Sequence, residues 1–88
     1  MVRYSEFGRM LVQLRHDAGF AQQADLAKRL RVAQQSVSRW ENGTSRPRAN
    51  EMPSLAKALD MDDADALLRA AGYIPSSTGL ATAAALSP

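Results

Sequence analysis

Apolar residues recur along the chain at the spacing of amphipathic helices. The apolar positions of the first stripe follow one another at i, i+3, i+4, i+7 and i+11, and they are Phe7, Met10, Leu11, Leu14 and Ala18. Ser5 precedes the stripe as a candidate N-cap, and Gly19 follows it as a natural stop. The pattern predicts a first helix over residues 5–18.

Two shorter apolar patterns follow, separated by a break at residues 31–33. Residues 23–30 offer Leu26, Ala27 and Leu30 to a core, and residues 34–41 offer Val37 and Trp40. Helices this short are not stable alone in water, so we expect tertiary packing to hold them. An Asn-Gly pair at 42–43 ends the second of them, because glycine readily adopts positive φ.

The second half of the chain predicts two more helices and a tail. Pro47 interrupts any helix across 44–48, so that segment is expected to be a loop. Asn50 is a candidate cap for a fourth helix, in which Pro53 falls in the tolerated first turn. Asp62 or Asp63 would cap a fifth helix. The apolar residues of these two helices are Met52, Leu55, Ala56, Leu59, Ala64, Leu67, Leu68 and Ala71.

The composition changes after residue 75. Residues 76–88, SSTGLATAAALSP, are uncharged and low in complexity, which is typical of a linker or tail. We therefore predict a folded domain over 1–75 and a flexible segment over 76–88, with a further C-terminal domain as a possible continuation.

Composition excludes several kinds of site. The chain has 88 residues, one histidine and no cysteine, which leaves no disulfide, no cysteine-bound zinc and no histidine-rich metal site. Neighbouring Asp62 and Asp63 are interpreted as helix caps, since no histidine or lysine lies near them in the sequence. No apolar run is long enough to cross a membrane. We expect no metal, no cofactor, no membrane partner and no catalytic residue.

Charge is distributed unevenly along the chain. Residues 1–48 carry nine Lys/Arg and four Asp/Glu, a net charge of +5, whereas residues 49–88 carry two and five, a net charge of −3. A basic half beside an acidic half suggests one face for a polyanion, although ordinary surface charge explains it equally well.

Two short helices with a break of about three residues have the spacing of a helix-turn-helix. In that motif the first helix braces against the DNA backbone, and the second places its N-terminal side chains in the major groove. The second helix must therefore be apolar inward and polar outward. Val37 and Trp40 meet the first demand, and the glutamines, serines and arginine of residues 34–39 meet the second.

The segment LAKRLRVAQQSVSRWENG, residues 26–43, resembles the Cro/C1-type (Xre) helix-turn-helix family of phage and bacterial repressors. Its Gln-Gln-Ser triplet, followed by Glu-Asn-Gly and then Arg-Pro-Arg, is especially similar to lambdoid phage repressors. The resemblance covers residues 4–75. It implies an all-α, compact five-helix, lambda-repressor-like domain with the helix-turn-helix at its second and third helices.

The resemblance also implies roles for individual residues. The expected base contacts are Gln34, Gln35, Ser36, Ser38 and Arg39. Glutamine suits an adenine edge and arginine suits guanine, so we expect at least one G·C pair in each half-site. The expected DNA backbone contacts are Gln22, Gln23, Arg31, Asn42, Thr44, Ser45, Arg46 and Arg48. Arg15 and Glu41 are expected to form a structural ion pair.

The chain departs from the family pattern at three places. One extra residue lies between Gly19 and Leu26, so Gln22 occupies the position where the family usually has a capping serine. Either Gln22 or Gln23 could then be the phosphate contact. Arg31 occupies a turn position where glycine is common, which costs roughly 1 kcal/mol if φ is positive there. Ala33 replaces a capping serine, which weakens that cap by about 1 kcal/mol.

These features predict a sequence-specific, double-stranded DNA-binding transcriptional regulator, a repressor, in the bacterial cytosol or nucleoid. We expect a homodimer on DNA, with an interface formed by Leu67, Leu68, Tyr73 and Ile74. Two alternatives remain open. One is the DNA-targeting module of a larger protein such as a restriction–modification enzyme, and the other is an antitoxin or protein-binding module.

Overall fold

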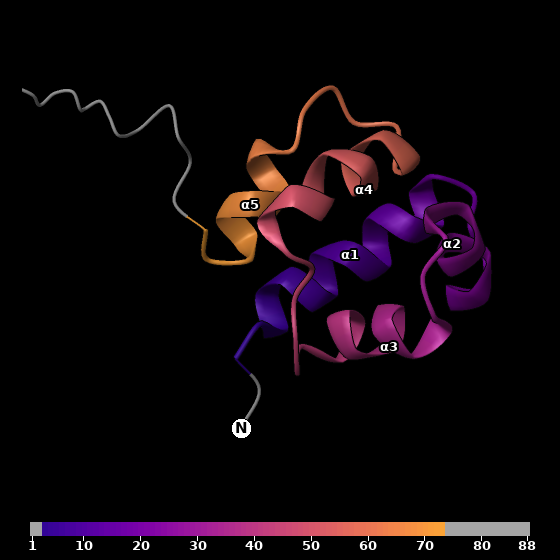
Figure 1. Cartoon of the computed structure of the whole chain (residues 1–88), viewed down its shortest axis with the longest axis horizontal. Helices are drawn as coiled ribbons and strands as arrows, with labels where there is room; N and C mark the ends of the chain where they lie inside the picture. Colours follow the sequence, from indigo (N-terminus) through magenta and orange to yellow (C-terminus); the bar gives the residue numbers. More distant parts are fainter. Residues whose placement is uncertain (1–2, 74–88) are drawn as a thin grey trace, which may run out of the picture.

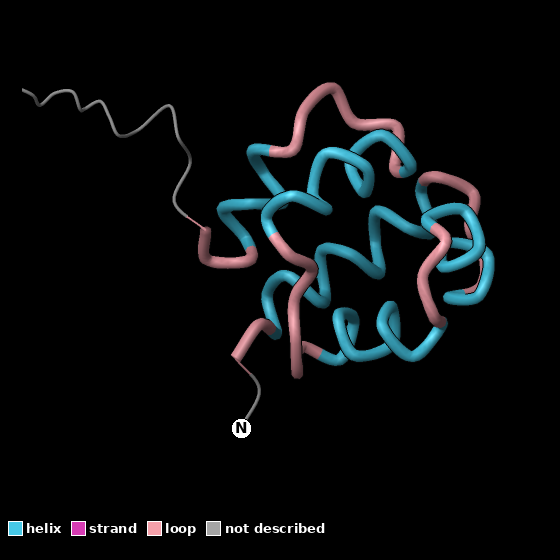
Figure 2. Tube along the Cα trace, in the orientation of Figure 1, coloured by secondary structure: helices cyan, strands magenta, loops and turns pink. Residues whose placement is uncertain are grey.

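The computed structural model describes residues 3–73, and within them every regular element is helical (Figures 1 and 2). The elements in order are α1 Ser5–Asp17, α2 Gln23–Leu30, α3 Gln34–Asn42, a 3-10 turn η1 Ala49–Glu51, α4 Met52–Ala58 and α5 Asp65–Ala70. The predicted all-α architecture with five α-helices is confirmed for this part of the chain. The predicted tail at 76–88 lies outside the described residues.

One apolar core holds the five helices together. α1 runs through the middle of the molecule and packs against α3 and α5, while α2 packs against α3 and α4 (Figure 1). The core is made of Phe7, Leu11, Leu26, Ala27, Val37, Trp40, Met52, Leu55, Ala56, Leu59, Leu67 and Ala71. Because α2 and α3 are each short, their orientation depends on this shared core.

The helix ends differ from the predicted caps in two places. Ser5 is the first residue of α1 and not its cap; the cap position belongs to Tyr4, whose N–H donates to the Gly43 carbonyl at 2.9 Å. Asn50 lies inside η1, whose cap position is Arg48. There the Glu51 carboxylate accepts the backbone N–H of Arg48 at 2.8 Å.

The other helix starts follow the predictions more closely. Pro53 falls in the first turn of α4, as expected. α5 begins at Asp65, later than predicted, with Ala64 at the cap position. The Asp63 carboxylate still accepts the backbone N–H of Asp65 at 3.0 Å, so Asp63 provides the side-chain bond that was expected from one of the two aspartates.

A close helix crossing at Gly8 was not predicted. A Cβ atom placed on Gly8 would collide with the backbone carbonyl of Glu41, and it would lie 3.0 Å from the carbonyl oxygen of Trp40. α1 therefore approaches the end of α3 more closely than any side chain would permit. The available signal was a glycine beside Phe7 on the apolar stripe, where alanine would favour the helix more.

Candidate nucleic-acid interface

A tight turn joins α2 to α3. Arg31 has φ +60° and ψ +43°, so the suspected positive φ is confirmed. The Val32 N–H donates to the Ala27 carbonyl at 3.0 Å, which closes the end of α2, and α3 starts at Gln34 after an uncapped Ala33. With Val37 and Trp40 buried beneath, this turn fixes α3 at a set angle to α2.

One side of α3 is polar and faces away from the core. Consecutive helical residues are about 100° apart around the axis, so five polar residues fall within an arc of about 140°. We call this set the recognition face, and it consists of Gln34, Gln35, Ser38, Arg39 and Asn42. Gln34, Gln35 and Arg39 are exposed, whereas Val37 and Trp40 point to the opposite side and are 0% and 6% exposed.

Ser36 lies outside the recognition face. It is half-buried toward the side of Trp40, and its hydroxyl oxygen is 3.5 Å from Nη2 of Arg39. A hydrogen bond this long is weak. Ser36 thus lies beside the Arg39 guanidinium and apart from the outward-facing set.

A buried polar network anchors both ends of the motif. The Arg15 Nε donates to Glu41 Oε2 at 2.6 Å, and the two side chains are 7% and 4% exposed. Arg15 Nη1 also donates to the carbonyls of Phe20 and Ala21, at 2.9 and 2.8 Å. Gln23 Nε2 donates to Glu41 Oε1 at 2.9 Å. The ion pair was expected, but the bond from Gln23 was not, and together they join α1, the start of α2 and the end of α3.

These bonds separate the two glutamines at the start of α2. Gln23 already spends one amide donor on Glu41. Gln22 is exposed at the cap position, and its backbone N–H donates to the Asp25 carboxylate at 3.2 Å. Of the two glutamines, Gln22 therefore has the side chain that is exposed to solvent. It lies beside the first turn of α2, where free backbone N–H groups suit a phosphate.

Thr44 has its donors engaged within the protein. Its backbone N–H and its hydroxyl both donate to the Arg39 carbonyl, at 3.0 and 3.2 Å. The Ser45 N–H approaches the same carbonyl at 3.4 Å. These bonds complete the end of α3. The phosphate contact of the exposed Thr44 stays a prediction, and it would redirect one of these two donors.

The two arginines of the loop after α3 differ sharply. Arg48 is exposed, as a phosphate contact requires. Arg46 is half-buried and turned toward the end of α5, and its DNA contact stays a prediction. Its Nη1 donates to the Ala71 carbonyl at 2.7 Å, and its guanidinium carbon lies 3.8 Å from the centre of the Tyr73 ring. Spacing alone did not distinguish the two, because Tyr73 lies far away in the sequence.

The four residues predicted for the dimer interface differ in their surroundings. Leu67 is 0% exposed and belongs to the core of its own chain, so it is not an exposed apolar residue. Leu68 is half-buried. The Tyr73 hydroxyl donates to the Pro47 carbonyl at 2.8 Å, so this side chain is engaged internally. Ile74 lies outside the described residues.

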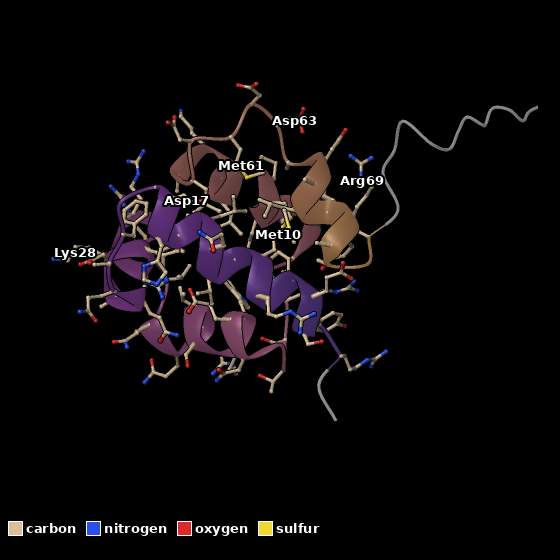
Figure 3. All side chains as sticks on the ribbon, turned by 180° about the vertical axis from the view of Figure 1, so that it is seen from behind. Met10, Asp17, Lys28, Met61, Asp63 and Arg69 are labelled. Carbon is tan, nitrogen blue, oxygen red and sulfur yellow. The ribbon has the colours of Figure 1, made fainter. Side chains whose placement is uncertain are left out.

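Asp63, in the loop between α4 and α5, lies away from α3. In Figure 3, Asp63 is at the upper edge of the molecule, while α3 runs along the lower edge. Across residues 3–73, histidine and acidic side chains form no group of three suited to a metal ion. In the same range no helix has the length and apolar character needed to span a bilayer.

The fold and the recognition face define a DNA-binding helix-turn-helix domain of the transcriptional-regulator class. The chain belongs to the helix-turn-helix domain family, whose model matches residues 6–71. It is similar to the crystal structure of the clp gene regulator ClgR from C. glutamicum, with a TM-score of 0.65 and 28% identity over 85% of this chain and 95% of that one.

A phage protein is also similar. The 26 kDa repressor protein of Escherichia phage HK022 is 54% identical over 37 residues, which are 42% of this chain and 16% of that protein. The chain thus spans a minor part of the length of this curated relative.

Proposed function

We propose that this chain binds double-stranded DNA in a sequence-specific manner, with the recognition face of α3 in the major groove. The observation that carries the proposal is the exposure of Gln34, Gln35 and Arg39 on a helix whose opposite side is buried. These three side chains are long enough to reach base edges, and the core beneath them restricts how the helix can tilt. Glutamine pairs with adenine and arginine with guanine in a bidentate manner.

The flanks of α3 supply the phosphate contacts in this proposal. Gln22 with the first turn of α2, Arg31 in the turn, and Arg48 in the following loop are exposed on the segments that adjoin α3. Contacts of this kind fix the register of a helix on the duplex and make binding depend on salt.

The proposed outcome of binding is transcriptional regulation, in which an occupied operator blocks RNA polymerase. Two copies would bind a twofold site with half-sites about one helical turn apart. Leu68, together with the chain that follows Tyr73, remains the candidate dimer contact. In this proposal the protein acts at the nucleoid in the bacterial cytosol, and none of its residues has a catalytic role.

Arg39 can be tested against a matched arginine elsewhere. A duplex is first selected from a random-sequence pool by the wild-type chain, and its affinity is then measured by fluorescence anisotropy. Arg39→Ala should weaken binding by roughly tenfold to a hundredfold and relax the preference at one base pair. Arg69 lies on α5, on the far side from α3 (Figure 3), so Arg69→Ala should bind as the wild type does. Equal affinities for the two variants would refute the assignment of the recognition face.

A further inference from the structure

Three segments that are distant in the sequence meet beside the loop after α3. The guanidinium carbon of Arg46 lies 5.0 Å from the ring centre of Tyr4 and 3.8 Å from that of Tyr73. Arg46 Nη1 donates to the Ala71 carbonyl at 2.7 Å, and the Tyr73 hydroxyl donates to the Pro47 carbonyl at 2.8 Å. We call these five residues the Arg46 clamp.

The backbone on both sides supports this arrangement. Gly72 has φ +87°, and a Cβ atom placed on it would lie 3.5 Å from Arg46 Nη1. The left-handed turn at Gly72 therefore directs Tyr73 back over the guanidinium. At the other end of the chain, the Tyr4 N–H donates to the Gly43 carbonyl at 2.9 Å. The Arg46 clamp is thus bonded to Gly43, the residue that caps the end of α3.

On the basis of the proposed DNA-binding function, we propose that Arg46 is a positioning residue for DNA binding and not a phosphate contact. Arg46 holds the loop 44–48 against residues 71–73, which follow α5. DNA affinity then depends on whether Tyr73 is packed on Arg46. A guanidinium flanked by two aromatic rings and bonded to a carbonyl gains from each contact. The ring stacking and the bond to Ala71 fix the guanidinium within the protein and engage Nη1, so that nitrogen is not available to a phosphate.

The consequence reaches Arg48 through a stiff connection. Arg48 is two residues beyond Arg46, and Pro47 between them has its carbonyl held by Tyr73. Movement of Tyr73 therefore releases Arg46 and Pro47, while the Arg48 backbone stays bonded to Glu51. Arg48 then still reaches its phosphate, but ordering the released loop on binding costs affinity. Any displacement of the chain at residue 73 would weaken DNA binding without touching DNA.

Salt dependence distinguishes a positioning residue from a phosphate contact. Each phosphate contact contributes about −0.9 to the slope of log affinity against log salt concentration. Affinity for the selected duplex is measured over a series of salt concentrations for the wild type, Arg46→Lys, Arg46→Gln, Tyr73→Phe and Tyr73→Leu. Arg48→Ala serves as the control for a lost phosphate contact. Tyr73→Phe removes only the hydroxyl, so it provides a folded variant at this position even if Tyr73→Leu unfolds the domain. A melting curve for each variant shows whether it is folded at the assay temperature.

We expect Arg46→Gln and Tyr73→Leu each to weaken binding by roughly three- to tenfold with an unchanged salt slope. Arg46→Lys should resemble Arg46→Gln, because lysine keeps the charge but loses the planar stacking. Tyr73→Phe should weaken binding less than Tyr73→Leu. Arg48→Ala should reduce the magnitude of the slope by about one.

The proposal is overturned if Arg46→Gln reduces the slope by about one while Arg46→Lys binds as the wild type does, because Arg46 is then a phosphate contact. It is also overturned if both Tyr73 variants bind with wild-type affinity. A wild-type chain that fails to bind duplex DNA even at low salt would instead refute the proposed function.

Discussion

Replacing Arg31 with glycine is expected to stabilise the domain. Arg31 has φ +60° and ψ +43°, a conformation that costs a residue with a Cβ atom about 1–2 kcal/mol. Glycine avoids that cost, but it loses more backbone freedom on folding, which takes back roughly 0.5–1 kcal/mol. The net gain in the free energy of unfolding should be about 0.5–1 kcal/mol. For a domain of this size, that corresponds to a rise of about 2–8 °C in the melting temperature.

Asp60 provides a matched control for this prediction. It has φ +64°, close to that of Arg31, but aspartate tolerates the left-handed region better than arginine does. Asp60→Gly should therefore gain less than Arg31→Gly. Urea and thermal unfolding of both variants would measure the difference, with an unchanged urea m-value as the condition for comparing them.

The same substitution has an opposite expected effect on binding. Arg31 is exposed beside α3, and the proposed function gives it a phosphate contact. Arg31→Gly should therefore bind DNA more weakly and with a smaller salt slope, although it is more stable. A loss of stability in Arg31→Gly, or an equal gain in Asp60→Gly, would refute the strain argument.

Variants at three further places in the chain test the scaffold. Gly8→Ala should destabilise the domain by about 1–2 kcal/mol in urea unfolding, because its Cβ collides with the Glu41 carbonyl. This overpacking exceeds the gain in helix propensity. Unchanged stability would mean that the α1–α3 crossing is looser than described. Ala33→Ser should stabilise the domain by about 1 kcal/mol in the same assay, because the backbone at the α3 cap is extended and Ala33 offers no side-chain bond there. No gain would mean that the serine hydroxyl does not reach the free N–H groups at the start of α3. Glu41→Ala should cost about 3–5 kcal/mol by leaving the buried Arg15 charge without a carboxylate. The double variant Arg15→Met with Glu41→Leu removes that charge but also the Arg15 bonds to two carbonyls, so it should recover part of the loss in thermal unfolding. An equal loss in both variants would refute this account of the ion pair.

Local patterns in the sequence were enough to predict the helices. Each apolar stripe repeats at helical spacing within a short window, and burial of that stripe is what makes each helix stable. The recognition face follows from the same periodicity, because Val37 and Trp40 fix which side of α3 is buried. Once those two residues are inside, Gln34, Gln35 and Arg39 must face outward.

Features set by contacts between distant segments were predicted less well. Tyr4 takes the cap position of α1 because it bonds to Gly43, and a sequence window around Ser5 does not contain that partner. Leu67 and Leu68 are neighbours in a short helix, so periodicity alone does not show which one is fully buried. Arg46 faces inward because Tyr4 and Tyr73, from opposite ends of the described chain, enclose it.

The role of α3 is tested most directly by titrating an isotope-labelled chain with a duplex selected from a random pool and following its amide resonances by NMR. The largest changes should fall on the backbone and side-chain amides of Gln34 and Gln35, with further changes near Gln22, Arg48 and the candidate dimer contact Leu68, while α4 changes little. Changes concentrated on α4, with the α3 amides unmoved, would contradict the account.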